Sequence, residues 1–452
     1  MQIKVFKFGG ASVNNPSGVR NVAAILKRYV NQPLVVVVSA MGKTTNALEE
    51  VLNHYLTRDP IPMIEAFERI RDYHSAILHE LFPEPDHPVF GEVGSLFDQL
   101  RGTIRKGHLF NNESIDYNFE YDQIVSFGEL ISSAIIHHYL LRAGIPAYQV
   151  DARELIRTDG SYREARVDWE ITEPVIRERL SGLLAGHDGK GGIVLTQGFI
   201  AGGPDGNTTT LGREGSDYSA AIFAHALRAD EMTIWKDVPG VMNADPKWLK
   251  NARKIDLLSF REAIELAYFG ASVIHPKTIK PLENANIILY VKSFRKPDLA
   301  GTVIRNMDSW KISVPIYIRK QNQVLISVSP RDFSFIVEEN LSNIFMILAK
   351  HRVKVNVMQN SAISFSICID GFPVETHQSV ETHRGASPHR GASLPKIITE
   401  LRKDYMVRYN ENVELYTIRH YNQRAINRIT KNKTVLLEQK TRGTVHLILG
   451  MI

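Results

Sequence analysis

Short apolar runs alternate with longer stretches of helical periodicity through the first two thirds of the chain. Residues 3–8 and 34–39 are short runs rich in β-branched residues, and residues 16–30 between them carry an apolar helical face. Asn15 and Pro16 suit the N-cap and the first turn of that helix. Similar apolar runs follow at 193–196, 232–235 and 287–291. Nearly continuous apolar strands are typical of a parallel sheet buried on both faces. The pattern predicts an α/β fold, a three-layer sandwich around a mostly parallel sheet.

Two further stretches, residues 46–110 and 124–142, are mainly helical in their periodicity. The first is a long excursion between strands, which we expect to cover a substrate site. We therefore predict that residues 1–305 form one domain.

After residue 301 the pattern changes to shorter, mixed elements. A strand is predicted at 324–328, a helix at 341–351 and strands at 353–357 and 363–369, which together make a β-α-β-β unit. Weaker strands follow at 413–418, 435–438 and 444–449, with a short helix near 423–429. We predict an α+β region over residues 306–452 with two modules. The first covers about 320–375 plus part of 395–412, and the second, abbreviated one covers about 413–452.

Residues 371–395 separate these two sets of elements and contain a tandem repeat. VETH occurs at 374 and 380, and HRGAS at 383 and 389. Such a Ser-, His-, Pro- and Gly-rich repeat cannot build a core, and we expect a mobile surface loop. His377, His383 and His389 recur every six residues, so a metal site is the alternative. Because no cysteine or carboxylate cage accompanies them, we expect no metal bound by the protein alone.

Composition narrows the functional classes. The chain has 452 residues, 44% of them hydrophobic and 23% charged, as in soluble proteins of several domains. It has no apolar stretch of roughly 20 residues and no signal-peptide core, which predicts a cytoplasmic protein without a membrane partner. Cys368 is the single cysteine, so disulfides and thiolate metal sites are excluded. Residues 396–452 carry 11 Lys and Arg against 5 Asp and Glu, but the signs are interspersed, and we expect no nucleic-acid partner.

Glycines and charges gather where strands are predicted to end. Lys7, Gly9, Gly10 and Ser12 follow the first strand and precede the first helix. Glycines let backbone N–H groups approach an anion, and a helix N-terminus adds partial positive charge, so phosphate is the natural ligand. The alternative is a simple tight turn. The spacing fits neither a Walker A loop nor a full GxGxxG.

Two later segments have the same character. Gln197-Gly-Phe-Ile-Ala-Gly-Gly follows a strand, and Thr208-Thr-Thr-Leu-Gly-Arg-Glu-Gly-Ser-Asp-Tyr then leads into an Ala-rich helix. Arg213 can grip a carboxylate or a phosphate through two hydrogen bonds. Trp235-Lys-Asp-Val-Pro-Gly-Val ends a third strand. A capped surface loop and an ordinary Pro-Gly turn are the alternatives.

Taken in order, these segments resemble the signature set of the aspartate kinases, within the amino acid kinase superfamily. The blocks are KFGGASV at 7, VSA at 38 with Thr45-Asn46, SFGE at 126, TTLGREGSDY at 209, DVPGV at 237 followed by ADP at 244, and FGASVIHP at 269. The resemblance implies phosphorylation of the side-chain carboxylate of L-aspartate by ATP with Mg²⁺, and ACT-type regulatory modules at the C-terminus. It also implies an amino-acid effector, lysine or threonine, and a homodimer or higher homo-oligomer.

The resemblance further implies roles for individual residues. The catalytic positions are Lys7, which bridges the nucleotide phosphates, and Asp217. The remaining ATP positions are Gly9, Gly10, Ser12, Lys236, Asp237, Met242 and Lys247. The positions around aspartate are Ser39, Thr45, Glu129, Arg213 and Asp217. The effector positions in the first module are Ser329, Val355, Asn356, Asn360 and Ser361.

Several positions depart from the pattern of the family. Ala11 replaces the commoner Thr, Glu214 stands where Gly is frequent, and Ser272 replaces a phosphate-holding lysine, for which Lys277 is a candidate substitute. In the effector region, Asn356 stands where an acidic residue often meets lysine, so we expect weak inhibition by lysine unless Glu338 or Glu339 supplies the charge.

The chemistry needs no general base, because an acceptor carboxylate with a pKa near ~3.9 is already ionised at neutral pH. Two alternatives remain open. Another amino acid kinase, acting on glutamate or carbamate, would share the glycine-rich start but lack the full ordered set of blocks. A catalytically silent amino-acid sensor would keep the modules and lose Lys7, Arg213 or Asp237, all of which are present.

Overall fold

The computed structural model describes residues 2–109, 116–186, 189–271, 274–307, 314–332, 334–372 and 393–450. The chain divides into two compact units. The first comprises residues 1–241, 254–267 and 272–310, and the second comprises residues 242–253, 268–271 and 311–452. Most of the repeat at 374–393 and its three histidines lie outside the described residues, so the loop and metal predictions stay untested.

The first unit is built on an eight-stranded sheet with the order β3-β4-β2-β1-β7-β9-β10-β8. The first six strands in this order run parallel, and only the β9–β10 pair is antiparallel. This confirms the predicted mostly parallel sheet. The strands are β1 (Lys4–Phe8), β2 (Leu34–Val38), β3 (Ala147–Val150), β4 (Ile193–Gln197), β7 (Glu231–Lys236), β8 (Leu257–Ser259), β9 (Ile288–Ser293) and β10 (Thr302–Arg305). A separate antiparallel pair is formed by β5 (Ile200–Gly202) and β6 (Thr208–Thr210).

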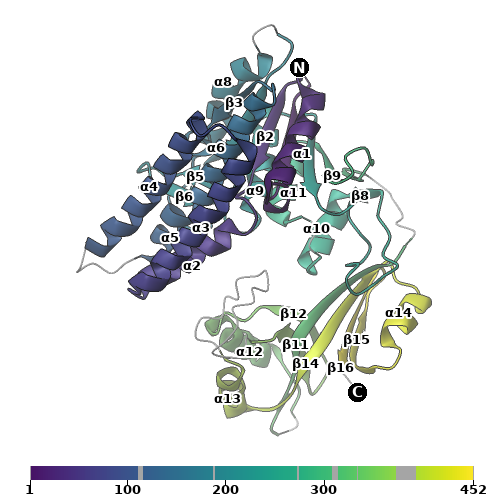
Figure 1. The fold of residues 1–452 in the computed structure, drawn as a ribbon. Helices are drawn as coiled ribbons and strands as arrows, with labels where there is room; N and C mark the ends of the chain where they lie inside the picture. Colours follow the sequence, from purple (N-terminus) through teal and green to yellow (C-terminus); the bar gives the residue numbers. More distant parts are fainter. Residues whose placement is uncertain are drawn as a thin grey trace. The chain divides into compact units, whose positions relative to one another are not determined.

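Helices cover both faces of this sheet and make the three layers (Figure 1). One face carries α1 and α6, and the other carries α8, α9 and α11. The helices α2 to α5 pack with one another and with α6, and correspond to the predicted excursion. The helices are α1 (Pro16–Leu26), α2 (Thr44–Leu56), α3 (Pro60–Leu81), α4 (Pro88–Leu109), α5 (Tyr117–Val125), α6 (Phe127–Arg142), α7 (Ala152–Leu155), α8 (Trp169–Ala185), α9 (Gly215–Leu227), α10 (Phe260–Tyr268) and α11 (Pro276–Asn284).

The sequence patterns explain these elements. All residues of Leu34–Val38 and of Ile193–Gln197 are buried, as expected of central parallel strands. By contrast, Ile288–Ser293 alternates between buried and half-buried residues, because it lies beside the antiparallel β10 toward the edge of the sheet. The Asn15 side chain accepts the Gly18 N–H at 2.8 Å, which confirms the predicted N-cap of α1.

One helical stretch among the described residues, Tyr117–Arg142, would be long and apolar enough to cross a membrane if only its length and composition were considered. It comprises α5 and α6, and 78% of its most apolar window is buried inside the protein. Its apolar side chains therefore belong to the core of the first unit.

The second unit is built on a six-stranded antiparallel sheet with the order β12-β13-β11-β14-β16-β15. The strands are β11 (Ile316–Pro330), β12 (Val355–Asn360), β13 (Phe365–Asp370), β14 (Tyr405–Arg419), β15 (Thr434–Lys440) and β16 (Thr444–Gly450). The helices are α12 (Glu338–Lys350), α13 (Leu394–Asp404) and α14 (Gln423–Thr430). In Figure 1, α12 and α13 lie toward one end of the long strands β11 and β14, and α14 lies toward the other.

Two cores occupy opposite ends of this sheet. One packs α12 and α13 against β13 and the halves of β11 and β14 that contain residues 324–330 and 405–407. The other packs α14 against β16 and the halves that contain residues 316–318 and 415–419. The unit thus has two α+β modules that share two continuous strands. The helix at 394–404 was not predicted, and the strands predicted at 324–328 and 413–418 are only parts of longer ones.

A segment from the first two thirds of the sequence completes the second of these cores. Ala244 and Leu249 are buried with Tyr416 and Ile418, and Trp248 packs against the same cluster. The rings of Trp248 and Tyr416 meet edge to face, with centroids 5.8 Å apart. Residues 242–253 therefore supply apolar cover to a module that has a single helix of its own.

Candidate active site

The turn after β1 brings backbone into close contact with the turn after β2. The Gly42 N–H donates to the Gly10 carbonyl at 3.1 Å, and a Cβ on Gly10 would lie 2.7 Å from the Ala40 carbonyl oxygen. Any side chain at Gly10 would therefore displace backbone. The hydroxyl of Ser12 is buried and has no hydrogen-bond partner among the described residues. A buried donor without a partner, in a glycine-rich turn at a strand end, is typical of a ligand site.

Lys7 lies in β1, directly before this turn, and forms an ion pair with Asp217. Its Nζ is 2.7 Å from Asp217 Oδ1, and the two side chains are 12% and 4% exposed. Asp217 comes from the first turn of α9, where the helix dipole favours a negative charge. Burial alone would raise the pKa of Asp217, but the charges of Lys7 and Lys236 hold it below its usual value. The Asp217 carboxylate is therefore ionised at neutral pH.

Glu129 is a second buried carboxyl group close to Lys7. It belongs to the first turn of α6, and its Oε1 accepts the Ala40 N–H at 3.3 Å. Its Oε2 is buried and has no hydrogen-bond partner among the described residues. Burial raises the pKa of Glu129 to about 8, against the opposing effects of the Ala40 N–H and the Lys7 charge. The site therefore holds a carboxyl group that a cationic ligand group would ionise.

Arg213 lies in the turn between β6 and α9, and the residue is exposed. Its side chain makes no hydrogen bond or ion pair with the part of the chain that the structure describes. Gly212 before it has φ +76° and Glu214 after it has φ +53°, so both are left-handed. A left-handed conformation is easiest for glycine, which explains why Gly is frequent at the position that Glu214 occupies here. The Glu214 carboxylate accepts the His275 N–H at 3.0 Å.

Ser39 and Thr45, predicted to contact aspartate, flank the same turn after β2. The Ser39 N–H donates to the Phe8 carbonyl at 3.1 Å, and its carbonyl accepts the Ser132 hydroxyl at 2.7 Å. Thr45 is half-buried in the first turn of α2. Ser39 is therefore held between β1 and α6, the two elements that carry Lys7 and Glu129.

The predicted adenosine and phosphate positions after β7 fall into both units. Lys236 ends β7, and the exposed Asp237 follows it in the first unit. Met242 and the exposed Lys247 belong to the second unit, within the segment that packs on the second module. Their roles toward ATP stay predictions.

The departures from the family pattern are only partly visible. Ser272 lies outside the described residues. Ala11 is exposed in the turn after β1, and Lys277 is exposed in the first turn of α11. Whether Lys277 replaces the missing lysine stays a prediction.

The predicted effector positions all lie in the first module of the second unit. Asn356 is the most connected of them. Its amide donates to Gln323 Oε1 and Asp370 Oδ1, both at 2.8 Å, and its oxygen accepts from Lys320 Nζ at 2.9 Å. Val355 and Asn360 begin and end β12, Ser329 lies near the end of β11, and Ser361 bonds with Ser364 just beyond β12.

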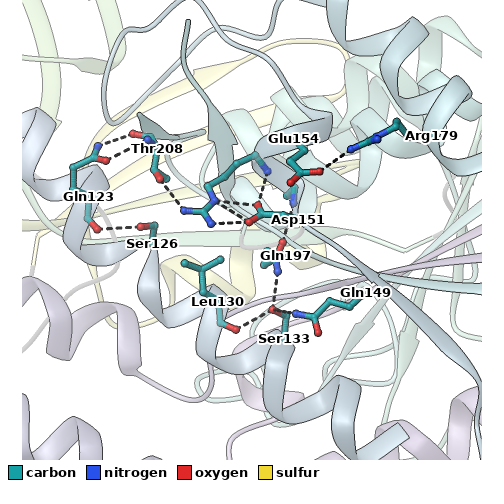
Figure 2. A network of polar contacts seen from close by, with 12 residues as sticks. Gln123, Ser126, Leu130, Ser133, Gln149, Asp151, Glu154, Arg179, Gln197 and Thr208 are labelled. Carbon is teal, nitrogen blue, oxygen red and sulfur yellow. Dashed lines mark hydrogen bonds and ion pairs between the residues drawn. The ribbon is translucent and has the colours of Figure 1, made fainter. Parts of the chain in front are cut away.

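A polar network that the sequence analysis did not foresee supports the site (Figure 2). Gln197 at the end of β4 accepts the Ala152 N–H and donates to the Ser133 hydroxyl, both at 2.8 Å. Gln123 on α5 donates to the Thr208 carbonyl at 2.8 Å and accepts the Thr208 N–H at 3.2 Å. These contacts fix α5, α6 and β6, the elements that precede or carry Glu129 and Arg213.

A further buried residue that sequence reasoning missed is Asp122, which neighbours Gln123. The available signal was a carboxylate seven residues before Glu129, in a stretch with helical periodicity. Neither Asp122 nor Gln123 belongs to the quoted motifs.

Comparison with known proteins agrees with this geometry. The profile described as "Amino acid kinase family" matches residues 2–293. The lysine-sensitive aspartokinase 3 of Escherichia coli is 31% identical, over 82% of this chain and 78% of the relative. The solved structure of E. coli aspartokinase III with lysine and aspartate matches with a TM-score of 0.76 and 26% identity. The same enzyme with aspartate and ADP matches with a TM-score of 0.74 and 27% identity. Each of these two matches covers 99% of this chain and 96% of the other. The chain belongs to the amino acid kinase family and, within it, to the aspartokinases.

Proposed function

We propose that the protein transfers the γ-phosphoryl group of ATP to the side-chain carboxylate of L-aspartate and forms 4-phospho-L-aspartate. The observation that carries this proposal is the buried Glu129 carboxyl group. Its Oε2 has no hydrogen-bond partner among the described residues, and the nearby charge of Lys7 favours its ionised form. A carboxyl group in this state suits the ammonium of an amino acid, next to a cation that suits phosphate. The structure of E. coli aspartokinase III with aspartate and ADP supports the same pairing of ligands.

The residues present fit a nucleotide. Gly9 and Gly10 add no side chain to the turn after β1, Ser12 offers a buried hydroxyl, and Lys7 offers a cation. Among the described residues there is no group of three or more side chains able to hold a metal ion. Mg²⁺ keeps much of its water and binds nucleotide oxygens, and Asp217 would be the carboxylate available to it here. When bound, Mg²⁺ would neutralise charge on the phosphate oxygens.

The mechanism then rests on positioning and charge. Glu129 binds the substrate ammonium and Arg213 its α-carboxylate, which directs the ionised side-chain carboxylate toward the phosphates. Lys7 stabilises the negative charge that develops between the β- and γ-phosphates, and Asp217 holds the Lys7 ammonium in place. No protein group has to remove a proton from the acceptor.

The direct test is ADP release from Mg·ATP with a panel of amino acids. We expect turnover with L-aspartate and poor turnover with L-glutamate, which is one methylene longer. Equal turnover with glutamate would favour another amino acid kinase. Aspartate binding in calorimetry without ADP release would favour the silent sensor. The cytoplasmic location and the homo-oligomeric state stay predictions, and size-exclusion chromatography with light scattering tests the second.

Regulation is the remaining part of the proposal. An end-product amino acid, lysine or threonine, would bind the first module of the second unit beside Ser329, Val355, Asn356, Asn360 and Ser361. The lysine found with E. coli aspartokinase III supports an effector of this class.

A further inference from the structure

The buried carboxylate of Asp122 joins three segments of the first unit that surround the turn carrying Arg213. Asp122 lies on α5 and is fully buried. Its Oδ2 accepts the Thr210 N–H at 2.8 Å and the Arg163 N–H at 2.9 Å, and its Oδ1 accepts the Thr210 hydroxyl at 2.6 Å. One side chain thus fixes α5, the end of β6 and the loop that contains Arg163.

The three segments are also bonded pairwise without Asp122. Gln123 bonds to both backbone groups of Thr208, at the other end of β6. The Ala165 N–H donates to the Thr210 carbonyl at 3.0 Å, which ties the loop to β6. The guanidinium of Arg163 lies over the ring of Tyr121 on α5, 4.4 Å from its centroid. Asp122 therefore sits at the centre of a closed set of contacts.

The backbone of the loop is strained where Asp122 holds it. Arg163 has φ +69°, a left-handed conformation that costs free energy in a residue with a side chain. A Cβ on Gly212 would lie 3.1 Å from the Arg163 carbonyl oxygen, so the loop packs directly on the residue before Arg213. The contact that pins Arg163 therefore also sets where the Arg213 turn begins.

The same helix leads to the other end of the substrate site. α5 ends at Val125, and Glu129 follows in the first turn of α6, seven residues after Asp122. Asp122 thus bonds the segment that leads into Glu129 to the strand that leads into Arg213. Glu129 and Arg213 are the two side chains assigned to the ammonium and the α-carboxylate of the substrate.

We infer that Asp122 is a positioning residue that sets the separation between Glu129 and Arg213, and with it the affinity for the amino-acid substrate. This inference rests on the proposed function. Lys7, Gly9, Gly10 and Ser12, assigned to phosphate, lie on β1 and in the turn that follows it, and none of these four bonds to Asp122. Loss of the Asp122 contacts should therefore act on aspartate and spare ATP.

Asp122→Asn is the main test, because it keeps the shape, removes the negative charge that strengthens all three hydrogen bonds, and obliges the Thr210 hydroxyl to accept where it now donates. The KM for aspartate should rise at least about tenfold, the loss expected for one hydrogen bond to a charged group. The kcat at saturating aspartate and the KM for ATP should stay within about threefold of wild type. Asp116→Asn is the matched control: Asp116 caps α5 through the Asn118 N–H, and Asn caps equally well. It should leave all three constants unchanged.

Wild-type ADP release with aspartate is measured first, so that failure of the proposed function is seen before any variant is made. Given an active wild type, an unchanged KM for aspartate in Asp122→Asn overturns the inference. A parallel loss in kcat and in both KM values also overturns it, since that outcome means general structural damage. If Asp122→Asn does not fold, Thr210→Val decides by the same criteria, because it removes only the hydroxyl bond and should raise the KM for aspartate alone.

Discussion

Lys7 Nζ lies 2.7 Å from Asp217 Oδ1, and the two side chains are almost fully buried. A buried ion pair compensates the desolvation of each member, so removal of one leaves the other as an unpaired buried charge. The pair therefore fixes a cation at the end of β1 before any phosphate arrives, and such preorganised charge lowers the barrier to phosphoryl transfer.

Replacement of that cation should slow the chemical step. We expect Lys7→Ala to lower kcat by roughly 10²-fold or more, as for loss of a single preorganised donor. Steady-state ADP release at saturating aspartate and ATP measures this. Lys4→Ala is the matched control, since Lys4 lies in the same strand and pairs with Glu231 at 3.1 Å. A Lys7→Ala variant that kept most of its kcat would show that the phosphate loop has been misassigned.

Arg213→Ala should act on the substrate rather than on the chemical step. The exposed guanidinium is available to a carboxylate, and a hydrogen bond to a charged group is worth roughly 1.5 to 3 kcal/mol. The KM for aspartate should therefore rise about tenfold to a hundredfold, with a smaller change in kcat. Arg228→Ala, at the other end of α9, is the control. An unchanged KM in Arg213→Ala would exclude the guanidinium as the carboxylate partner.

The raised pKa of Glu129 predicts a pH dependence of substrate binding. With a pKa of about 8, the free enzyme carries this group mainly protonated at neutral pH, whereas the substrate ammonium favours its ionised form. The KM for aspartate should fall as the pH rises from about 6.5 toward 8.5, and binding should release protons. Calorimetry in two buffers of different ionisation enthalpy measures the proton release. Proton uptake on binding would contradict the assignment.

The same group predicts the sign of a stability effect. The folded-state pKa of Glu129 lies above its unfolded value, so the folded state binds more protons between the two, and its stability falls as the pH rises through that interval. Glu129→Gln removes this titration. Its melting temperature should gain on wild type from about pH 5 to pH 8, while activity with aspartate is lost. A difference in melting temperature that does not vary with pH would contradict this explanation.

Inhibition by lysine should be weak. The Asn356 side chain is uncharged, donates both amide hydrogens and accepts from Lys320, so it offers a free lysine no negative charge. Titrations with lysine, threonine and methionine, singly and in pairs, measure the response, and a true effector must shift the aspartate or ATP dependence. Strong inhibition by micromolar lysine that survives Glu338→Gln and Glu339→Gln would show that the site has been misread.

The parallel core of the fold was predictable, because its strands are continuous apolar runs and its helices have clear apolar faces. Shorter strands such as Leu257–Ser259 have too few residues to show a recognisable apolar pattern. In the second unit, the polar stretches around Asn322 and Asn412 hid two long strands, since bulged positions with φ +51° and +55° interrupt the alternation. The helix Leu394–Asp404 shows the 3.6-residue period, with Leu394, Ile397 and Leu401 buried, but its nearness to the repeat obscured it.

For the site, the sequence motifs predicted candidate residues. They did not predict the protonation state of these residues or the buried side chains that hold the surrounding segments in place. The burial that raises the pKa of Glu129 comes from surrounding helices that its own motif does not contain. Asp122 and Gln197 act through partners that lie between 41 and 88 residues away in sequence. Such contacts depend on tertiary packing, which local patterns do not encode.

The packing of residues 242–253 on the second module bears on how this enzyme can be divided or recombined. Ala244, Trp248 and Leu249 have their apolar neighbours in the C-terminal part of the chain. A gene fragment that stopped near residue 305 would encode the phosphate loop and the aspartate site, yet it would expose these side chains to water. Selection for a freestanding kinase, or an engineered fusion of this catalytic part to another sensor, would have to replace that apolar surface first.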